Sequence, residues 1–287
     1  GLISHMPDAH TWPRILGRLI DRADLSEEET AWAMDQIMSD AATPSQIGGF
    51  AVGLRAKGET PGEIAGMASA MLAHARTLDI DYTAVDIVGT GGDRAGSVNI
   101  STMSSLVVAA AGAPVVKHGS RAASSKSGAA DVLETMGVAI TMSPDDVLRC
   151  VSEVGIGFCF APAFHPALKY AGATRRELGV PTTFNMLGPL SNPAQPSASL
   201  IGCAYRDKTR VLAEVYADRG HDVLLVRGDD GLDEITTTTT TTAWVITGGT
   251  IRETTIDPQA LGISLATEED LKGGTPEINA RAVHELV

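Results

Sequence analysis

The sequence has few cysteines, and no apolar run in it is long enough to cross a bilayer. Among its 287 residues the three cysteines are Cys150, Cys159 and Cys203, and their wide separation fits neither a metal site nor a disulfide framework. Their apolar neighbours favour buried, reduced thiols, which predicts a cytoplasmic protein. Residues 1–5 are expected to be a vector remnant ahead of Met6.

Basic residues are also scarce. The chain carries 22 Lys and Arg against 35 Asp and Glu, which gives a formal net charge of −13. Lys and Arg nowhere form a long run, and a duplex-binding surface needs a basic face, so we expect no general nucleic-acid binding. Aromatic residues make up 4% of a chain that is 44% hydrophobic, so the core must consist mainly of aliphatic side chains.

The first part of the chain carries helix signals. Ser26 and Glu29 form a capping-box pattern ahead of apolar positions at helical spacing. Two further segments each begin with Thr-Pro, at Thr43 and Thr60, and this pair is typical of a helix start. These signals predict a small helical domain over residues 7–80.

From Val85 onward, short β-branched runs alternate with helical patterns, which favours a largely parallel sheet with helices on its faces. We therefore predict an α/β protein with a small all-helical domain and a larger α/β domain built on a mostly parallel central sheet. The α/β domain should cover residues 81–164 and 191–287. The helical stretch after His165 interrupts the alternation, so residues 165–190 are expected to return to the helical domain. The threonine run at 236–242 suits a strand and an adjoining turn.

Three loops in this second part carry chemistry. "DIVGTGGDRAGSVNIST" places a glycine-rich loop between a strand at Val85–Val88 and a helix capped at Asn99–Thr102. Backbone N–H groups of such a loop and the positive end of the helix make an anion site. Its spacing is neither G-x-G-x-x-G nor a Walker A loop, and a tight turn is an equally good interpretation of this loop alone.

The next strand ends in "KHGSRAASSKSG", which gathers Lys117, His118, Arg121 and Lys126 with four serines. Two such loops at successive strand ends favour a polyphosphate ligand, because open α/β sheets bind ligands there. "GDDGLDEITT" then adds Asp229, Asp230, Asp233 and Glu234 after a third apolar strand. Mg²⁺ prefers a few carboxylates together with phosphate oxygens, so the three loops together predict a magnesium–polyphosphate site.

The same stretches resemble a known family. "GTGGD", "SVNIST", "KHGSRAASSKSGAADVLE", "FAPAFHPALKYAGATRRELGVPTTFNMLGPLSNPA" and "GLDEITT" follow one another as in anthranilate phosphoribosyltransferases of the tryptophan pathway. The resemblance implies Mg²⁺-dependent transfer of a phosphoribosyl group from phosphoribosyl pyrophosphate to the amine of anthranilate. It also implies a homodimer with the fold of the pyrimidine nucleoside phosphorylases.

Site residues follow from the resemblance by position. The residues expected at the phosphoribosyl pyrophosphate site are Gly89, Gly92, Asp93, Ser97, Asn99, Ile100, Ser101, Thr102, Lys117, Gly119, Arg121, Ala122, Ala123, Ser124, Ser125 and Ala129. Those expected at anthranilate are Gly89, Ser120, His165 and Arg175, with His118 nearby. Ser101, Asp233 and Glu234 would hold Mg²⁺, while Lys117, His118 and Arg175 would act in catalysis. The Asp93 carboxylate need not face phosphate, since it can accept hydrogen bonds from ribose hydroxyls or loop N–H groups or hold metal through water.

The chain departs from the family pattern at two points. Ser120 stands where the family has Asn, and the shorter side chain implies a lost or water-mediated contact with anthranilate. Family members normally continue with more helix after the last residues here, which implies that part of the outer layer of the α/β domain is missing.

Three alternatives stay open at this point. A pyrimidine nucleoside phosphorylase would use phosphate as its nucleophile and need no Mg²⁺, so "GLDE" argues against it. A non-catalytic relative that binds nucleic acid is opposed by the net charge of −13. The third alternative is a protein that binds phosphoribosyl pyrophosphate but turns over poorly because of Ser120. A structural role for His118 and His165 is as good an interpretation as a functional one.

Overall fold

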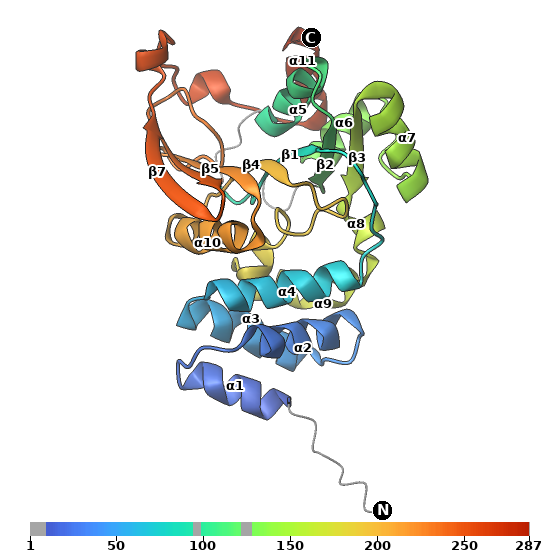
Figure 1. Ribbon diagram of the computed structural model, residues 1–287, viewed down its shortest axis with the longest axis vertical. Coiled ribbons are helices and arrows are strands. Elements are labelled where there is room, and N and C mark those ends of the chain that lie inside the picture. Colours follow the sequence, from blue (N-terminus) through green and yellow to red (C-terminus); the bar gives the residue numbers. More distant parts are fainter. Residues whose placement is uncertain (1–9, 94–98, 122–127, 287) are drawn as a thin grey trace, which may run out of the picture. The chain divides into compact units, whose positions relative to one another are not determined.

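Two compact units make up the structure, a computed structural model that describes residues 10–93, 99–121 and 128–286 (Figure 1). The first, the helical unit, consists of Gly1–His74 with Ala167–Leu187. The second, the α/β unit, consists of Ala75–Pro166 with Gly188–Val287. The domain limits inferred from the sequence stay predictions.

The helical unit is built from helices whose starts are encoded locally. Its helices are α1 (Trp12–Ile20), α2 (Glu27–Met38), α3 (Pro44–Lys57), α4 (Pro61–Ala73) and α9 (Lys169–Leu178), with short 3₁₀ turns at η1 (Pro166–Leu168) and η2 (Thr183–Met186). Ser26, Thr43 and Thr60 each accept a hydrogen bond from the backbone N–H three residues on, and each forms a capping box. The caps predicted from the sequence are confirmed.

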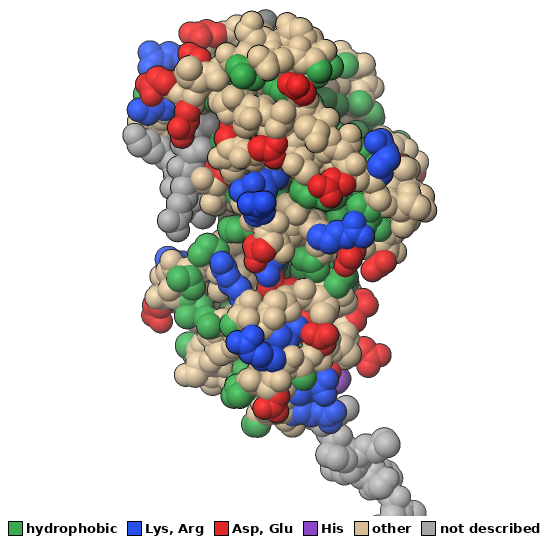
Figure 2. Space-filling view, turned by 90° about the vertical axis from the view of Figure 1, so that its left-hand side faces the viewer, with side chains coloured by type: hydrophobic (Ala, Val, Ile, Leu, Met, Phe, Trp, Pro, Cys, Tyr) green, Lys and Arg blue, Asp and Glu red, His purple; other side chains and the backbone are tan. Residues whose placement is uncertain are grey.

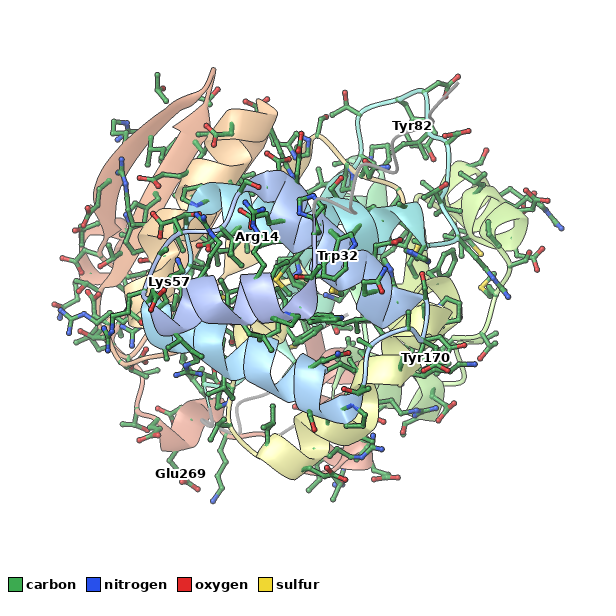
Figure 3. All side chains as sticks on the ribbon, turned by 90° about the horizontal axis from the view of Figure 1, so that it is seen from below. Arg14, Trp32, Lys57, Tyr82, Tyr170 and Glu269 are labelled. Atoms are coloured by element: carbon green, nitrogen blue, oxygen red, sulfur yellow. The ribbon has the colours of Figure 1, made fainter. Side chains whose placement is uncertain are left out.

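The core of this unit combines aromatic contacts with a close helix approach. The rings of Trp12 and Trp32 lie 5.3 Å apart between centroids, and Trp12 meets Phe50 edge-on at 6.0 Å (Figure 3 labels Trp32). A Cβ on Gly66 of α4 would lie 2.2 Å from the Glu27 carbonyl oxygen and from the Thr30 hydroxyl of α2. Glycine therefore sets how closely α2 and α4 pack.

A seven-stranded sheet forms the centre of the α/β unit, in the order β3-β2-β1-β4-β5-β6-β7. The strands are β1 (Val85–Gly89), β2 (Val115–Gly119), β3 (Ile156–Phe160), β4 (Ala198–Gly202), β5 (Asp222–Gly228), β6 (Thr241–Thr247) and β7 (Thr250–Ile256). The first five are parallel, and β6 and β7 run antiparallel at one edge. The predicted fold class is confirmed.

Helices cover both faces of this sheet. They are α5 (Ile100–Ala110), α6 (Ala129–Thr135), α7 (Pro144–Val154), α8 (Ala161–Phe164), α10 (Thr209–Arg219) and α11 (Pro276–Leu286), with 3₁₀ turns at η3 (Arg206–Lys208), η4 (Gln259–Leu261) and η5 (Glu269–Leu271). The chain leaves β1 towards β2 but leaves β4 towards β5 on the other side. Right-handed crossovers therefore place α5 and α10 on opposite faces, as Figure 1 shows. In the part of the chain that the structure describes, no helix is long and apolar enough to cross a membrane.

Two expectations need adjustment. Strand β6 begins only at Thr241, so most of the threonine run precedes it. Its hydroxyls bind carboxylates: Thr236 donates to Asp230 at 2.8 Å and Thr242 to Asp229 at 2.8 Å. Of the three cysteines, Cys159 and Cys203 are buried free thiols, but Cys150 is only half-buried, because it lies on the outer part of α7 rather than in a strand.

Candidate active site

The glycine-rich loop follows β1 at the carboxyl edge of the sheet. Gly91 and Gly92 have φ values of +68° and +81°, a region that residues with a Cβ rarely adopt. The neighbouring strand β2 is parallel to β1, so the two loops predicted to bind phosphate leave the sheet at the same edge. Ser97 lies outside the described residues, as do Ala122, Ala123, Ser124 and Ser125 of the second loop.

Asp233 contacts the start of the glycine-rich loop. Its Oδ2 accepts the Gly91 N–H at 2.8 Å, and a Cβ on Gly89 would lie 2.2 Å from the same oxygen. Asp93 is tied to the same group, since its Oδ2 accepts the Asp233 N–H at 3.5 Å. One use expected for Asp93, accepting a loop N–H, is therefore present in the structure.

Two carboxyl groups of this cluster, those of Asp233 and Glu234, have raised pKa values. Burial, followed by the charge of Asp93, raises the pKa of Asp233 to about 7. Burial and the charges of Asp233 and Asp93 raise the pKa of Glu234 well above its usual value, although the Lys117 charge opposes this. Among the described residues, Oε2 of Glu234 is buried without a hydrogen-bond partner.

The residues here fit a magnesium ion that takes only a few of its ligands from the protein. No group of three or more His, Cys, Asp or Glu side chains within the described ranges converges as a complete metal site. Mg²⁺ commonly takes only one or two carboxylates and completes its shell with phosphate and water. The unpartnered oxygen of Glu234 and the raised pKa values of Asp233 and Glu234 suit the binding of a cation. The other two acidic residues of this loop, Asp229 and Asp230, are instead held by the threonine hydroxyls.

Lys117 lies between β1 and the start of α5. It is 3% exposed on β2, and its Nζ donates to the Ile87 carbonyl at 2.5 Å and to Ser101 Oγ at 3.1 Å. Burial lowers its pKa, while the charges of Asp86, Glu234 and Asp233 act in the other direction without reversing the shift. Within the described residues Lys117 has no ion-pair partner, so the ammonium is a buried charge in contact only with neutral oxygens.

The start of α5 adds donors at the same place. Asn99 occupies the N-cap position, but its side chain makes no capping hydrogen bond. The backbone N–H groups of Ile100, Ser101 and Thr102 belong to the first turn, where a helix has no internal acceptors. The Ser101 hydroxyl contacts Lys117, and Thr102 is buried. The structure thus brings Ser101, one of the predicted residues of α5, to Lys117.

Arg121, at the start of the second loop, is paired with carboxylates of α6. Its Nη1 lies 3.0 Å from Asp131 Oδ1 and 3.2 Å from Glu134 Oε1, and its guanidinium lies 5.5 Å from the centre of the Phe160 ring. The α6 carboxylates therefore hold Arg121 against Phe160, and its role with phosphate stays a prediction. Ser120 is exposed beyond β2, and a Cβ on Gly119 would lie 3.4 Å from that of Ala129.

His118 and His165 form a buried pair with ring centroids 5.3 Å apart. His118 Nδ1 lies 3.0 Å from the Gly188 carbonyl and His165 Nε2 lies 2.7 Å from the Ser191 carbonyl. A carbonyl only accepts, so these nitrogens carry the protons and the other two are acceptors. Burial, together with the charge of His165, lowers the pKa of His118 to about 3, so the ring is neutral at physiological pH. Among the described residues, His118 Nε2 and His165 Nδ1 have no partner.

Arg175 belongs to the helical unit, whereas Gly89, Ser120 and His165 belong to the α/β unit. It lies in the last turn of α9, with its guanidinium 5.5 Å from the centre of the buried Phe184 ring. This cation–π contact holds the guanidinium beside the ring. Its neighbour Arg176 is exposed.

Two further buried polar residues near this site, Asp86 and Asn192, were not predicted from the sequence. Asp86 on β1 accepts the His118 N–H at 3.2 Å and the Asn192 amide at 2.9 Å, and Asn192 also donates to the Val116 carbonyl at 2.9 Å. Burial raises the pKa of Asp86 to about 6 despite the Lys117 charge. A charged residue inside an apolar strand, "VDIVG", is the signal that could have revealed Asp86.

The helical bundle and the α/β domain are those of a glycosyl transferase family. Residues 13–75 match the family described as "Glycosyl transferase family, helical bundle domain" and residues 81–287 the one described as "Glycosyl transferase family, a/b domain".

More specific relatives are anthranilate phosphoribosyltransferases. The protein of Saccharopolyspora erythraea is 63% identical over 97% of this chain and 80% of its own length, and that of Nocardia farcinica 62% over 93% and 77%. The crystal structure of the Thermus thermophilus enzyme matches with a TM-score of 0.88 at 40% identity, over 94% of this chain and 80% of that one. The chain belongs to the anthranilate phosphoribosyltransferase family.

Two solved structures from Saccharomyces cerevisiae contain ligands. One is an anthranilate phosphoribosyltransferase in complex with phosphoribosyl pyrophosphate (PRPP) and Mg. It matches with a TM-score of 0.88 at 28% identity, over 99% of this chain and 82% of that one. The other is in complex with 4-fluoroanthranilate, with a TM-score of 0.84 at 25% identity over 96% and 81%.

Proposed function

We propose that the chain transfers the phosphoribosyl group of phosphoribosyl pyrophosphate (PRPP) to the amine of anthranilate in tryptophan biosynthesis. The anthranilate nitrogen forms a bond to the anomeric carbon, the bond from that carbon to the pyrophosphate oxygen breaks, and the amine loses a proton. The observation that carries this proposal is Lys117, a buried ammonium without an ion-pair partner in the described chain, between a glycine loop and a helix N-terminus. Such a charge suits the anion that departs in this reaction.

Stabilising the departing pyrophosphate is the main task of the protein. The buried Lys117 ammonium, the loop N–H groups and the first turn of α5 offer preorganised donors, and such donors stabilise developing negative charge strongly. Mg²⁺, the cofactor, would be held by Asp233, Glu234 and the Ser101 hydroxyl and would supply further positive charge to the pyrophosphate.

The amine acceptor needs orientation more than a strong base. The pKa of His118 lies at about 3, so its Nε2 suits accepting a hydrogen bond from the amine rather than removing a proton. Arg175 would pair with the anthranilate carboxylate, since a guanidinium matches a carboxylate with two parallel hydrogen bonds. The cation–π contact with Phe184 would restrict the guanidinium in this role.

The alternatives have less support. A nucleoside phosphorylase would have no use for a carboxylate cluster with raised pKa values beside its phosphate loops. Nucleic-acid binding is opposed by the net charge, and on the face drawn in Figure 2 basic side chains are interspersed with acidic ones. The buried thiols of Cys159 and Cys203 support a location in the reducing cytoplasm. The homodimer rests on the family resemblance, and light scattering would test it.

Loss of anthranilate fluorescence on adding PRPP, with Mg²⁺ or with EDTA, tests the proposal. We expect decay that depends on both PRPP and Mg²⁺. No decay with PRPP, combined with phosphorolysis of a pyrimidine nucleoside, would favour the alternative enzyme.

Replacing Arg175 and Arg176 singly with Ala separates the positioning role from general charge. Loss of a charge-assisted hydrogen bond predicts that R175A raises the KM for anthranilate by roughly 10- to 100-fold. R176A, the matched control, should leave it within about twofold, since an exposed charge contributes little. An unchanged KM in R175A would remove Arg175 from the site.

A further inference from the structure

Asn279 links α11 to the start of α5. Although it lies 180 positions along the chain from Asn99, its Nδ2 donates to Asn99 Oδ1 at 2.6 Å. It is 2% exposed, so water does not compete for this bond. Asn279 lies outside all the motifs that the resemblance uses.

The orientation of both amides follows from a backbone group. The Gly274 N–H, which can only donate, lies 2.8 Å from the Asn279 side chain, so the atom facing it must be the acceptor Oδ1. Asn279 therefore turns Nδ2 to Asn99, and Asn99 must answer with Oδ1. The chain of donors and acceptors leaves a single arrangement.

This arrangement determines what Asn99 offers to its surroundings. The side chain of Asn99 makes no capping bond to α5, so its amide is not needed for starting the helix. With Oδ1 held by Asn279, the other branch of the same planar amide is Nδ2, a donor. A donor suits the anionic oxygens of a phosphate, whereas a carbonyl oxygen in its place would repel them.

We propose that Asn279 is a positioning residue, which fixes the Asn99 amide so that its NH₂ group faces PRPP. This inference rests on the proposed function, because it takes Asn99 as part of the PRPP site. Packing keeps Asn279 in place: Val283 and Ala280 of α11 are buried against Val132 of α6. The C-terminal helix thereby contributes to substrate binding without contacting substrate.

The test compares KM values for PRPP in N279A and N279D with wild type, at saturating anthranilate and Mg²⁺. N279A releases the amide, and N279D, which has nearly the same shape, presents oxygens that attract the Asn99 NH₂ group away from PRPP. We expect KM for PRPP to rise about tenfold in both variants, the loss typical of one hydrogen bond to a charged group, with KM for anthranilate unchanged. V283A, the control, should lower Tm and leave both KM values unchanged. A wild-type KM in N279D would overturn the proposal.

A double-mutant cycle shows whether Asn279 acts through Asn99. In the N99A background, the additional N279A change should alter KM for PRPP by less than about twofold, because the amide to be positioned is gone. Independent, multiplying effects would overturn the positioning role.

Calorimetry of the wild-type protein with PRPP and Mg²⁺ separates this inference from the proposed function. Absence of PRPP binding by wild type would overturn the proposed function itself. Binding by wild type, with an unchanged KM for PRPP in N279A and N279D, would overturn only this inference.

Discussion

Lys57 of the helical unit and Lys117 of the α/β unit are both almost completely buried, yet their surroundings are opposite. The Lys57 ammonium contacts Glu63 Oε1 at 2.7 Å and Asp24 Oδ1 at 2.9 Å. Lys117 contacts a carbonyl and a hydroxyl, and the carboxylates that influence it act only at a distance. Accordingly the pKa of Lys57 is raised and that of Lys117 is lowered.

The carboxylates that influence these two lysines differ in the same way. Glu63 is completely buried with both oxygens used: Oε2 accepts the Leu25 N–H at 2.8 Å, and Oε1 accepts the Thr60 N–H at 2.7 Å. Glu234 is only half-buried, but its Oε2 is buried and unpartnered among the described residues. A buried charge whose partners are all within the chain contributes to the fold. One that lacks a contact partner in the chain is suited to a ligand.

Replacing Lys117 with Met should have the largest effect, and it tests directly whether Lys117 differs from Lys57 in serving the ligand rather than the fold. We expect kcat/KM for PRPP to fall by about 1,000-fold, because a preorganised charge at the leaving group is removed. Tm should stay equal or rise, since a buried ammonium without an ion-pair partner is costly to keep. The fluorescence assay and a thermal melt measure the two. A sharp fall in Tm with nearly normal kinetics would mean that Lys117 is structural.

Lys57→Met, the matched change in the helical unit, should do the reverse (Lys57 is labelled in Figure 3). Removing one member of a buried ion pair leaves Glu63 without its counter-charge, so we expect unfolding to become easier by about 3 kcal/mol. KM for PRPP should not change. Lys272→Met removes an exposed lysine and serves as control, with no shift in denaturant midpoint expected. Equal midpoints for K57M and K272M would contradict the structural role of Lys57.

The smallest expected effect is the pH dependence of the stability that Lys57 contributes. Burial lowers the pKa of Lys57, but hydrogen bonds and charges of Glu63 and Asp24 outweigh it, so the folded-state pKa lies above the ordinary value of 10.5. A raised pKa contributes stability that is fully present below the unfolded pKa and lost as pH rises through the folded one. The Tm difference between wild type and K57M should therefore be constant below about pH 9 and shrink above about pH 11. A difference that grows with alkalinity would refute this assignment.

Local signals in the sequence were sufficient for much of the fold. The caps at Ser26, Thr43 and Thr60 depend on residues three positions apart, so they can be recognised without tertiary structure. Alternating β-branched and helical runs likewise gave the α/β class. The residues at the ends of β1 and β2 could be assigned to one site because parallel neighbours end at the same edge of a sheet.

Contacts between side chains six or more positions apart could not be predicted in this way. Arg121 looked available for phosphate, but α6 brings Asp131 and Glu134 to it. Only the family resemblance separated Asp233 and Glu234 from the other carboxylates of "GDDGLDE", and threonine hydroxyls hold those other two. Asp86 and Asn192 are 106 positions apart and meet only in the folded sheet.

The sequence by itself determined the helix starts, the alternation of strands and helices, and the residue types that the phosphate loops present. Each of these depends on neighbours a few positions away or on side-chain chemistry alone. Only the tertiary structure decided which buried charges find partners, as in Lys57, and which do not, as in Lys117. It also decided that Asn279 meets Asn99, because desolvation and long-range hydrogen bonds exist only once distant segments are packed together.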